Sequence, residues 1–373
     1  MSDEFTVQDE QFMQRALDLA AKGIYTTTPN PAVGCVLVKN GEIVGEGFHF
    51  QAGQPHAERV ALAQAGEKAK GATAYVTLEP CSHYGRTPPC ALGLIEAGVV
   101  KVVAAMEDPN PQVAGRGLSM LAEAGIESAV NLLKDSAEKL NKGFLKRMRK
   151  GTPFVQLKLA MSLDGKTAMA NGESKWITGA ASRADVQKMR AKSSALLSTS
   201  ATVLADDPSL NVRWEDFSVD LKKEYVKETV RQPVRVILDS QHRIQPSHKL
   251  FETASPVWLV SSEVRDLAGF PEFCEQIILP QDNLLSKLMV ELGKRQINSL
   301  WVEAGKNLAG SLIEQKLVDE LILYIAPKLL GEQARGLCNL PHLTQLADAP
   351  LWKLNEFQQI GDDIKLTYTP KGF

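Results

Sequence analysis

The chain has 373 residues, of which 44% are hydrophobic and 23% are charged. These fractions are those of ordinary globular proteins, so they exclude a collagenous, disulfide-dense or mainly disordered chain. The 42 basic and 44 acidic side chains leave a formal net charge of −2, without the basic excess typical of nucleic-acid-binding proteins. The length favours two domains, each able to bury its own core.

The termini and cysteines favour a cytoplasmic protein. The first ten residues, MSDEFTVQDE, are acidic and lack the apolar run of a signal peptide. The sequence contains no run of about 18 apolar residues, so we expect no membrane span. An odd number of cysteines indicates free or metal-bound thiols, and Cys35, Cys274 and Cys338 are interpreted as small apolar core residues.

Helix-like and strand-like segments alternate in the first half. In chain order we expect a helix around residues 12–20, strands at 32–38 and 43–48, a helix at 56–65, a strand at 74–78, a proline-rich loop at 79–89, a short helix, and a strand at 101–105. Asn40-Gly41 is typical of a tight hairpin between the first two strands. The alternation predicts an α/β domain with α/β/α layers.

Residues 134–150 are predicted to form one helix, which carries four basic residues in its last five positions. Cations stabilise a helix C-terminus, so a solvated connecting helix explains them, and a phosphate- or partner-binding patch is the alternative. Gly151-Thr152-Pro153 ends the helix, and we place the domain boundary there, giving domains 1–150 and 151–373. The second domain is also predicted to be α/β, with strands at 154–160, 195–197, 234–238, 257–260, 299–302 and 320–325.

One histidine and two cysteines form the strongest chemical pattern of the first half. His56-Ala57-Glu58 is followed by Pro80-Cys81 and, after eight intervening residues, by Cys90. One imidazole and two thiolates can bind zinc and leave its fourth position for water, whose pKa then falls to about 7. Glu58 is placed as the proton shuttle, and the pattern is typical of zinc deaminases. We expect His56 and Glu58 at the start of one helix and Cys81 at the end of a strand.

Two alternatives stay open for this cluster. Nucleobase deaminases usually have two residues between the cysteines, so a structural zinc with His83 as fourth ligand is one alternative, although it leaves Glu58 without a role. Buried core cysteines without a metal are the other, although a proline-rich loop is a poor core segment.

Three stretches of the first half resemble the deaminase domain of the bifunctional riboflavin-biosynthesis proteins: TPNPAVG at 28–34, the segment 81–90, and DPNP at 108–111. The resemblance implies a cytidine-deaminase-like fold that hydrolytically removes the 2-amino group of a diamino-hydroxy-phosphoribosylamino-pyrimidine. It implies that His56, Cys81 and Cys90 bind Zn²⁺ and that Glu58 is catalytic. The implied substrate contacts are Asn30, His49, His83, Arg86, Asp108 and Asn110.

These residue types suit that substrate. Amides such as Asn30 and Asn110 can pair with a pyrimidine edge, and Arg86 and the two histidines can meet a ribose phosphate. The plain alternatives are that Asn30 is only a turn residue, that Asp108-Pro109-Asn110 is only a loop, and that His49 is a hydrogen-bonded strand histidine.

The segment VEAGKNLAGS at 302–311 partly matches a phosphate-binding loop. No lysine lies between Gly310 and Ser311, which excludes the nucleoside-triphosphatase motif, and no G-x-G-x-x-G follows a strand. The remaining interpretation is a strand that ends at Val302, followed by a glycine-containing turn and a helix that starts near Leu308. The N–H groups of a helix start suit a dinucleotide phosphate, and an ordinary strand-to-helix turn is the alternative.

Four stretches, 158–178, 199–213, 238–240 and 302–311, resemble the reductase domain of the same family. The resemblance implies a fold related to dihydrofolate reductase, which reduces the ribosyl side chain to ribityl with NADPH. The implied NADPH contacts are Ala160, Trp176, Thr202, Asp206, Ser240, Gly305, Lys306, Asn307, Leu308, Ala309, Gly310 and Ser311. The implied substrate contacts are Ser174, Arg190, Leu210, Arg213 and Glu303.

Ser200 and Ala304 stand where the family often has glycine. Serine is restricted at positive φ, so the loop geometry there is an open question. Arg190 and Arg213 suit a phosphate clamp, with ordinary surface arginines as the alternative. We hypothesise that Glu303 or a water supplies the proton for the reduction.

The sequence therefore predicts a bifunctional zinc hydrolase and NADPH oxidoreductase of riboflavin synthesis. Its partners are small phosphoribosyl pyrimidines rather than nucleic acid or membranes, and family analogy predicts a homo-oligomer. The alternatives are activity in only one domain, a zinc-stabilised scaffold, and a nucleic-acid-editing deaminase. The aromatic fraction of 6% and the near-neutral charge weigh against the last.

Overall fold

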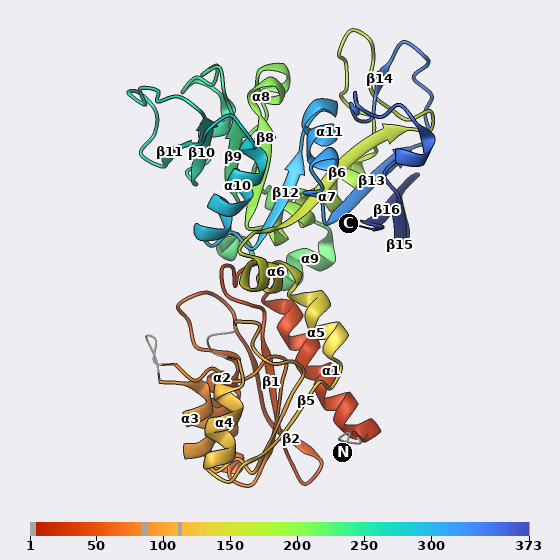
Figure 1. Cartoon of the computed structure of the whole chain (residues 1–373). Helices are drawn as coiled ribbons and strands as arrows, with labels where there is room; N and C mark the ends of the chain where they lie inside the picture. Colours follow the sequence, from red (N-terminus) through yellow and green to blue (C-terminus); the bar gives the residue numbers. More distant parts are fainter. Residues whose placement is uncertain (1–4, 84–87, 111–113, 373) are drawn as a thin grey trace. The chain divides into compact units, whose positions relative to one another are not determined.

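The structure, a computed structural model, describes residues 5–83, 88–110 and 114–372. The chain divides into two compact units, Met1–Gly151 and Thr152–Phe373 (Figure 1). Each unit has its own sheet and its own hydrophobic core, and each is described by itself.

The described part of the first unit contains a five-stranded sheet in the order β2-β1-β3-β4-β5. Strands β3, β4 and β5 are parallel, and β1 is antiparallel to both its neighbours. Helices α1 and α5 cover one face, and α2, α3 and α4 cover the other (Figure 1). The elements are α1 (Val7–Lys22), β1 (Gly34–Lys39), β2 (Glu42–Phe48), α2 (Ala57–Ala65), β3 (Thr73–Val76), α3 (Cys90–Glu96), β4 (Lys101–Ala104), α4 (Arg116–Glu123), β5 (Glu127–Val130), α5 (Lys134–Leu140) and α6 (Lys142–Lys150).

Local sequence explains several of these elements. A capping box between Thr6 and Asp9 starts α1. Asn40 and Gly41 have φ of 53° and 80°, which is the geometry of the predicted hairpin turn between β1 and β2. Gly34 has no side chain because α1 packs against it: a Cβ there would lie 1.9 Å from the Ala16 carbonyl oxygen.

The prediction of one helix over residues 134–150 is wrong. The segment forms α5 and α6, which meet at Asn141 with φ of −114° and ψ of 24°. The Asn141 side chain accepts from the Ala32 N–H at 2.8 Å and donates to the Ala32 carbonyl at 2.9 Å. This long-range pairing holds the buried break in place. Cys81 also lies in a loop, five residues beyond Val76 at the end of β3, rather than at a strand end.

In the described residues of the second unit, nine strands form one sheet in the order β11-β10-β9-β8-β12-β6-β13-β16-β15, and β14 pairs with β7. The strands from β11 to β13 are parallel, whereas β16 is antiparallel to β13 and β15. The strands are β6 (Phe154–Ser162), β7 (Lys166–Ala168), β8 (Ala195–Thr199), β9 (Val234–Leu238), β10 (Val257–Ser261), β11 (Cys274–Ile278), β12 (Ser299–Glu303), β13 (Glu320–Ala326), β14 (Arg335–Gly336), β15 (Trp352–Ile360) and β16 (Asp363–Pro370). The helices are α7 (Ala180–Lys192), α8 (Ser200–Asp206), α9 (Val219–Glu224), α10 (Leu284–Lys294) and α11 (Lys306–Glu314).

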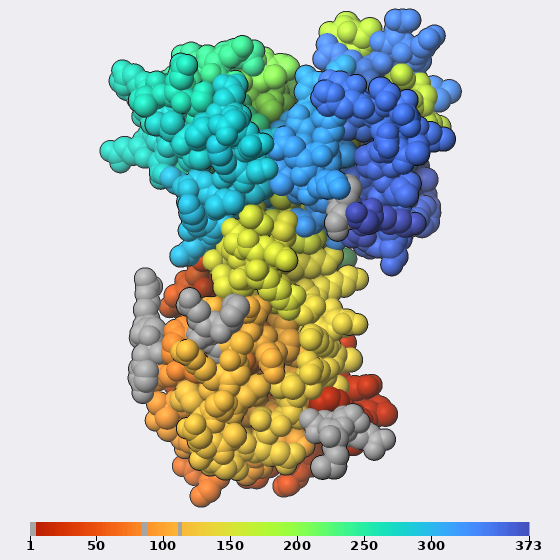
Figure 2. Space-filling model, viewed as in Figure 1, coloured from red at the N-terminus to blue at the C-terminus, as the bar shows by residue number. Residues whose placement is uncertain are grey.

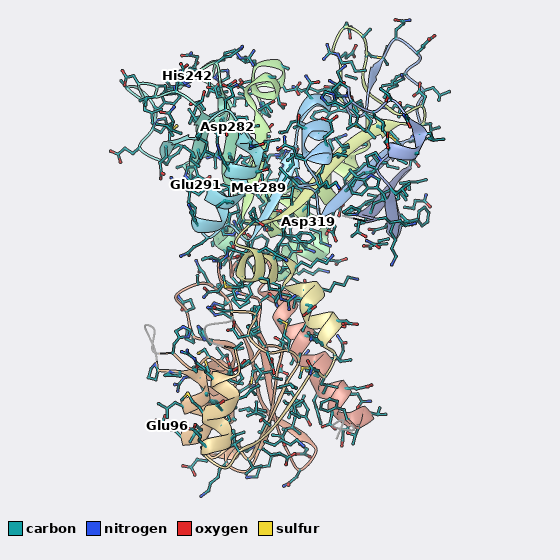
Figure 3. The ribbon with its side chains drawn as sticks, in the orientation of Figure 1. Glu96, His242, Asp282, Met289, Glu291 and Asp319 are labelled. Carbon is teal, nitrogen blue, oxygen red and sulfur yellow. The ribbon has the colours of Figure 1, made fainter. Side chains whose placement is uncertain are left out.

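Two apolar clusters pack this sheet. Helices α10 and α11 contribute to one, and α7 and α8 contribute to the other. Met289 and Glu291, labelled in Figure 3, show the amphipathic character of α10: Met289 is buried, whereas Glu291 accepts from Arg295. Burial of one helix face on the sheet stabilises this arrangement.

All six strands predicted for the second unit are present, and the helix predicted to start near Leu308 begins two residues earlier, at Lys306. Ser200 is the first residue of α8 and is not among the residues with positive φ, so glycine is not required there. Within the ranges that the structure describes, no helix is long and apolar enough to cross a membrane.

Candidate active sites

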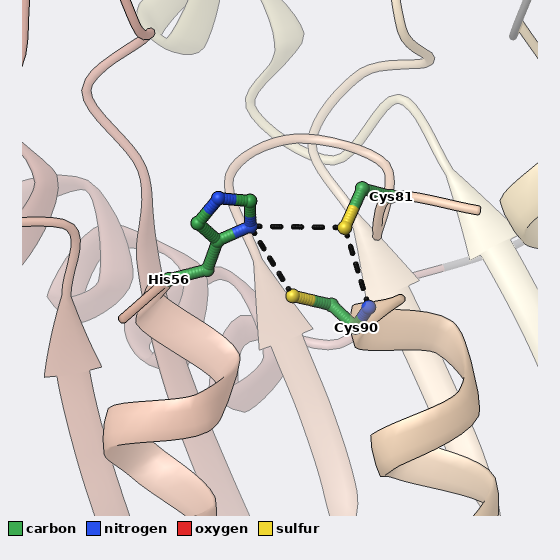
Figure 4. Close-up of side chains that lie close together, drawn as sticks. All are labelled: His56, Cys81 and Cys90. Carbon is green, nitrogen blue, oxygen red and sulfur yellow. Dashed lines mark hydrogen bonds between the residues drawn. The ribbon is translucent and has the colours of Figure 1, made fainter. Parts of the chain in front are cut away.

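The first unit brings together three side chains that could bind a metal ion (Figure 4). His56 is the residue immediately before α2, Cys81 lies in the loop after β3, and Cys90 is the first residue of α3. The His56 Nδ1 atom lies 3.7 Å from Cys81 Sγ and 3.4 Å from Cys90 Sγ. The Cys90 N–H also donates to Cys81 Sγ at 3.2 Å. All three donor atoms lie within 4.8 Å of one another.

This triangle fits tetrahedral zinc. Zinc–sulfur and zinc–nitrogen bonds of about 2.3 and 2.0 Å at tetrahedral angles place nitrogen and sulfur about 3.5 Å apart. Two observed distances, 3.4 and 3.7 Å, bracket that value. His83 is not part of the triangle that the described residues form.

The electrostatics of the triangle also favour a cation. Hydrogen bonds from Cys90 and then His56, acting against burial, lower the pKa of Cys81 to about 4. The Cys81 thiolate, together with burial, raises the pKa of Cys90 far above its usual range. The site therefore disfavours two thiolates until a positive charge lies between them, which is what a divalent metal supplies.

Glu58, His56 and Cys81 line a cavity of about 500 Å³. Glu58 is the second residue of α2, as predicted, and is only 3% exposed. Burial, and then the nearby Cys81 thiolate, raise the pKa of Glu58. A carboxyl with a raised pKa exchanges protons more readily near neutral pH. The cavity lining comprises Asn30, Pro31, Val33, His49, Ala52, Gly53, Gln54, His56, Glu58, Leu78, Glu79, Cys81, His83, Asp108 and Phe144.

Asn30 and His49 form one wall of this cavity. Asn30 Nδ2 lies 3.0 Å from His49 Nε2, and His49 Nδ1 lies 3.1 Å from the Pro55 carbonyl oxygen. These contacts assign the proton to Nδ1, and burial lowers the pKa of His49. His49 is thus a hydrogen-bonded histidine, as the plain alternative had it, and it also lines the cavity.

The remaining predicted contacts of the first unit differ in position. His83 and Asp108 line the cavity, whereas Asn110 follows Asp108 in a turn in which its N–H donates to Asp108 Oδ1 at 2.8 Å. Arg86 lies outside the described residues. Phe144 of α6 also lines the cavity, and sequence reasoning missed it because the surrounding helix reads as a basic, solvated segment.

The second unit places Arg190 and Glu303 in a buried ion pair. Arg190 Nε and Nη2 donate to the two Glu303 oxygens at 2.6 and 2.9 Å, and Trp301 Nε1 donates to Glu303 Oε1 at 2.8 Å. Although burial opposes it, the Arg190 charge lowers the pKa of Glu303 to about 2. An acid with this pKa holds no proton at neutral pH, so the hypothesis that Glu303 donates the proton conflicts with its surroundings.

Lys158 was not identified from the sequence. It lies on β6 directly across from Glu303 on β12, and its Nζ is 5.9 Å from the centre of the Tyr324 ring. Burial lowers the pKa of Lys158, while the Glu303 charge opposes that change. A lysine, an arginine and a carboxylate therefore converge at the C-terminal end of β12, beside the middle of β6. The C-terminal ends of strands are where open α/β sheets bind ligands.

The other predicted substrate contacts are more dispersed. Arg213 is exposed and forms an ion pair with Asp216 at 2.7 Å. Leu210 is buried with φ of 49°, and Ser174 lies in the segment between β7 and α7.

The predicted cofactor residues include an accessible helix start. No side chain caps α11, and a Cβ on its N-cap residue Gly305 would meet nothing within 4 Å. The N–H groups of Lys306 and Asn307 therefore fit a phosphate of NADPH. Further along, Ala309 is buried, and a Cβ at Gly310 would lie 1.8 Å from the Asn339 carbonyl oxygen. The small size of Gly310 thus accommodates the segment around Asn339.

Trp176 is exposed, and the Arg183 guanidinium lies 4.6 Å from the centre of its ring. Asp206 at the end of α8 lies 3.8 Å from Lys175, and Thr202 follows the α8 cap. Ala160 lies on β6, and Ser240 follows β9. Their contacts with NADPH stay predictions.

Two family descriptions match the chain. Residues 6–106 match the cytidine and deoxycytidylate deaminase zinc-binding region, and residues 153–366 match the RibD C-terminal domain. The riboflavin biosynthesis protein RibD of Haemophilus influenzae is 83% identical over 369 residues, which cover 99% of each chain.

Solved structures agree with these matches. Acinetobacter baumannii RibD has a TM-score of 0.90 at 48% identity, covering 98% of this chain and 99% of its own. A diaminohydroxyphosphoribosylaminopyrimidine deaminase/5-amino-6-(5-phosphoribosylamino)uracil reductase from Thermotoga maritima has a TM-score of 0.86 at 34% identity, with the same coverage.

The fold, the three possible metal-donor side chains and the matches to known proteins together define the class of protein. It is a bifunctional enzyme that joins a zinc deaminase to a pyrimidine reductase, with Zn²⁺ and NADPH as its cofactors. The chain belongs to the riboflavin biosynthesis protein RibD family. The predicted fold class, family and enzyme class are confirmed.

Proposed function

We propose that residues 1–150 catalyse the deamination step of this family and residues 151–373 the reduction. The substrate of the first step is 2,5-diamino-6-(5-phosphoribosylamino)pyrimidin-4-one, and its product, 5-amino-6-(5-phosphoribosylamino)uracil, is the substrate of the second. The observation that carries the assignment is the His56, Cys81 and Cys90 triangle, which adjoins Glu58 and a cavity large enough for a small molecule.

In the deamination, His56, Cys81 and Cys90 hold the zinc. Zinc, when bound, supplies the positive charge that makes water acidic enough to lose a proton near neutral pH. Glu58 accepts that proton and delivers it to the leaving amino group. A C–O bond forms at C2, the C–N bond breaks, and ammonia leaves. Asn30, Asp108 and Asn110 orient the ring, and Arg86, His49 and His83 are proposed to meet the ribose phosphate.

In the reduction, the N–H groups at the start of α11 bind a phosphate of NADPH, which supplies the reducing equivalent. The ring-opened ribosylamine presents an imine carbon, and its reduction to a ribityl group also consumes one proton. The ionised Glu303 accepts hydrogen bonds in this region, and Arg190 holds its carboxylate in place. Water is the proposed proton source, because the pKa of Glu303 is about 2.

A coupled assay tests the assignment. Purified enzyme receives the diaminopyrimidine ribotide, ammonia release is followed, and NADPH oxidation is then followed at about 340 nm. Glu58→Gln is expected to lower the rate of ammonia release by about 10²-fold or more. The oxidation of NADPH with the deaminated intermediate is expected to continue. Loss of both activities in a folded Glu58→Gln protein would contradict two separate sites.

The proposed homo-oligomer has support on the outer hairpin of the second unit. Leu354 and Phe357 on the edge strand β15 are 49% and 64% exposed, and this hairpin lies at the dark-blue end of the colouring in Figure 2. Exposed apolar edge strands favour association. Sedimentation of wild type and Phe357→Glu tests this: a lower mass for the variant is expected, and a monomeric wild type would contradict it.

A cytoplasmic location is also proposed. It is supported by the five cysteines, all of which are unpaired, as is usual in a reducing compartment. Fractionation of cells that express the chain tests it, and recovery from the periplasm with disulfides formed would contradict it.

A further inference from the structure

The carboxylate of Glu79 gathers backbone groups from two distant parts of the first unit. Its Oε2 accepts from the N–H groups of Asp108 and Gly115, both at 3.0 Å. Its Oε1 accepts from the N–H groups of Gly117 and Leu118 at 2.8 and 3.3 Å. Glu79 is 4% exposed, so these bonds are shielded from water.

Glu79 supplies the cap that α4 lacks. Gly115, the N-cap residue of α4, has no side chain to bind the first N–H groups of the helix, and those groups need acceptors. Glu79 takes this role from a segment 36 residues earlier, and its negative charge suits a helix N-terminus. The backbone N–H of Glu79 in turn donates to the Met106 carbonyl at 2.9 Å.

The same carboxylate fixes a wall of the cavity. Asp108, held through its N–H by Glu79, lines the cavity beside Cys81 and His83. Asp108 Oδ1 accepts from the Asn110 N–H, so the position of Asn110 depends on Asp108. Glu79 itself is separated from Cys81 only by Pro80.

Close packing leaves this arrangement little freedom. A Cβ at Gly117 would lie 2.0 Å from the Pro80 carbonyl oxygen and 3.1 Å from Glu79 Oε1. Residue 117 must therefore be glycine for α4 to approach the segment that carries both Glu79 and Cys81.

We infer that Glu79 is a positioning residue for the deaminase: it couples the segment that carries Cys81 to the Asp108–Asn110 turn, and so sets the geometry of the substrate-binding wall. The inference rests on the proposed function of the first unit. It predicts that Glu79 governs substrate affinity more than zinc affinity or the chemical step.

Glu79→Gln tests this in the full-length, zinc-loaded enzyme. Glutamine keeps the size of the side chain but turns an NH₂ group toward two of the N–H donors, which then lose their acceptor. The KM of ammonia release for the diaminopyrimidine ribotide is expected to rise about tenfold or more, because the unpaired N–H groups displace the Asp108–Asn110 turn that binds the substrate. The kcat is expected to change by less than about threefold. The zinc content is expected to stay unchanged.

Two variants and one internal control sharpen the test. Gly117→Ala should raise the KM in the same way, since it displaces α4 without changing charge. Asp9→Asn, a carboxylate change in the same unit at the Tyr75 hydroxyl, should leave the KM unchanged. NADPH oxidation with the deaminated intermediate measures the second unit in each preparation. Faster hydrogen exchange at residues 115–118 in Glu79→Gln would report the lost bonds directly.

An unchanged KM in folded, zinc-loaded Glu79→Gln overturns the inference. Loss of zinc in Glu79→Gln, or a fall in kcat with an unchanged KM, also overturns it, because either assigns Glu79 to metal binding or to general stability. If Glu79→Gln fails to fold, an unchanged KM in Gly117→Ala overturns the inference. A wild-type enzyme that binds zinc but releases no ammonia refutes the proposed function instead, and the inference falls with it.

Discussion

Arg190 and Glu303 lie 113 residues apart in sequence and form a bidentate ion pair at the C-terminal end of β12. Both side chains are largely shielded, with exposed fractions of 10% and 15%. Breaking such a pair by neutralising one partner costs about 3–5 kcal/mol, because it leaves the other charge buried and alone.

The pair predicts a particular dependence of stability on pH. The pKa of Glu303 is lowered to about 2, so the pair stabilises the folded state above the ordinary carboxyl pKa near 4.3 and loses that contribution as the pH falls toward 2. Wild type should be more stable than Glu303→Gln at pH 7, and the difference should shrink as the pH falls from about 5 to 3.

Urea unfolding followed by tryptophan fluorescence measures this difference, since all five tryptophans lie in the second unit. Asp216→Asn removes the exposed Arg213 pair and serves as the control, with an expected change below about 1 kcal/mol. A difference between wild type and Glu303→Gln that stays constant with pH would refute the assignment.

Removal of the metal should separate the two activities. A chelator is expected to abolish ammonia release and to spare NADPH oxidation with the deaminated intermediate, because the triangle lies wholly in the first unit. Cys90→Ala should lose the metal, whereas Glu58→Gln should keep it and lower kcat by about 10²–10⁴-fold. Metal analysis of each protein checks these outcomes, and a metal-free Cys90→Ala enzyme with normal ammonia release would contradict them.

Asn141→Ala should weaken the first unit from a point remote in sequence. It removes both bonds to Ala32 and leaves two buried backbone groups without partners, at about 1–3 kcal/mol each. Because Ala32 follows the cavity residues Asn30 and Pro31, the KM of deamination should rise as well. Hydrogen exchange and ammonia-release kinetics measure the two effects. Glu138→Gln, which affects only the partly exposed pair with Arg149, is the matched control, and equal behaviour of the two variants would exclude the role of Asn141.

Lys158→Met should impair reduction alone. It removes a half-buried cation on β6, opposite Glu303 on β12. A preorganised charge of this kind contributes about 10²-fold to a reaction. The kcat/KM for NADPH oxidation should fall by roughly that factor, with ammonia release unchanged. Lys294→Met on the exposed end of α10 controls for the loss of a lysine, and normal reduction by Lys158→Met would remove Lys158 from the site.

Local patterns explain which parts of the fold could be predicted. The β1–β2 hairpin follows from Asn40-Gly41, and α2 agrees with the helix expected at residues 56–65. The zinc triangle could be proposed because metal ligands are recognised by type and spacing. Its closure in space confirms that these three side chains meet, while their role as ligands stays a prediction.

The features that sequence reasoning missed depend on distant partners. The helix break at Asn141 depends on hydrogen bonds to Ala32, 109 residues away. The local sequence around Asn141 does not predict this break. Strand β15 was missed because nearly all of its residues are exposed, so it lacks the alternation of buried and exposed residues that marks a strand. In the sequence, Lys158 is an ordinary lysine of a predicted strand. Its position opposite Glu303 becomes visible only when β12 pairs with β6.

The position of α6 at the end of the first unit determines how short a deaminase fragment can be. The zinc-binding match ends at residue 106, and a fragment ending there would keep all three proposed metal ligands. It would lack Phe144, which lines the cavity, and Asn141, which holds Ala32. A free-standing deaminase therefore has to extend through Lys150, and a shorter fragment is expected to retain zinc while it loses the wall that selects its substrate.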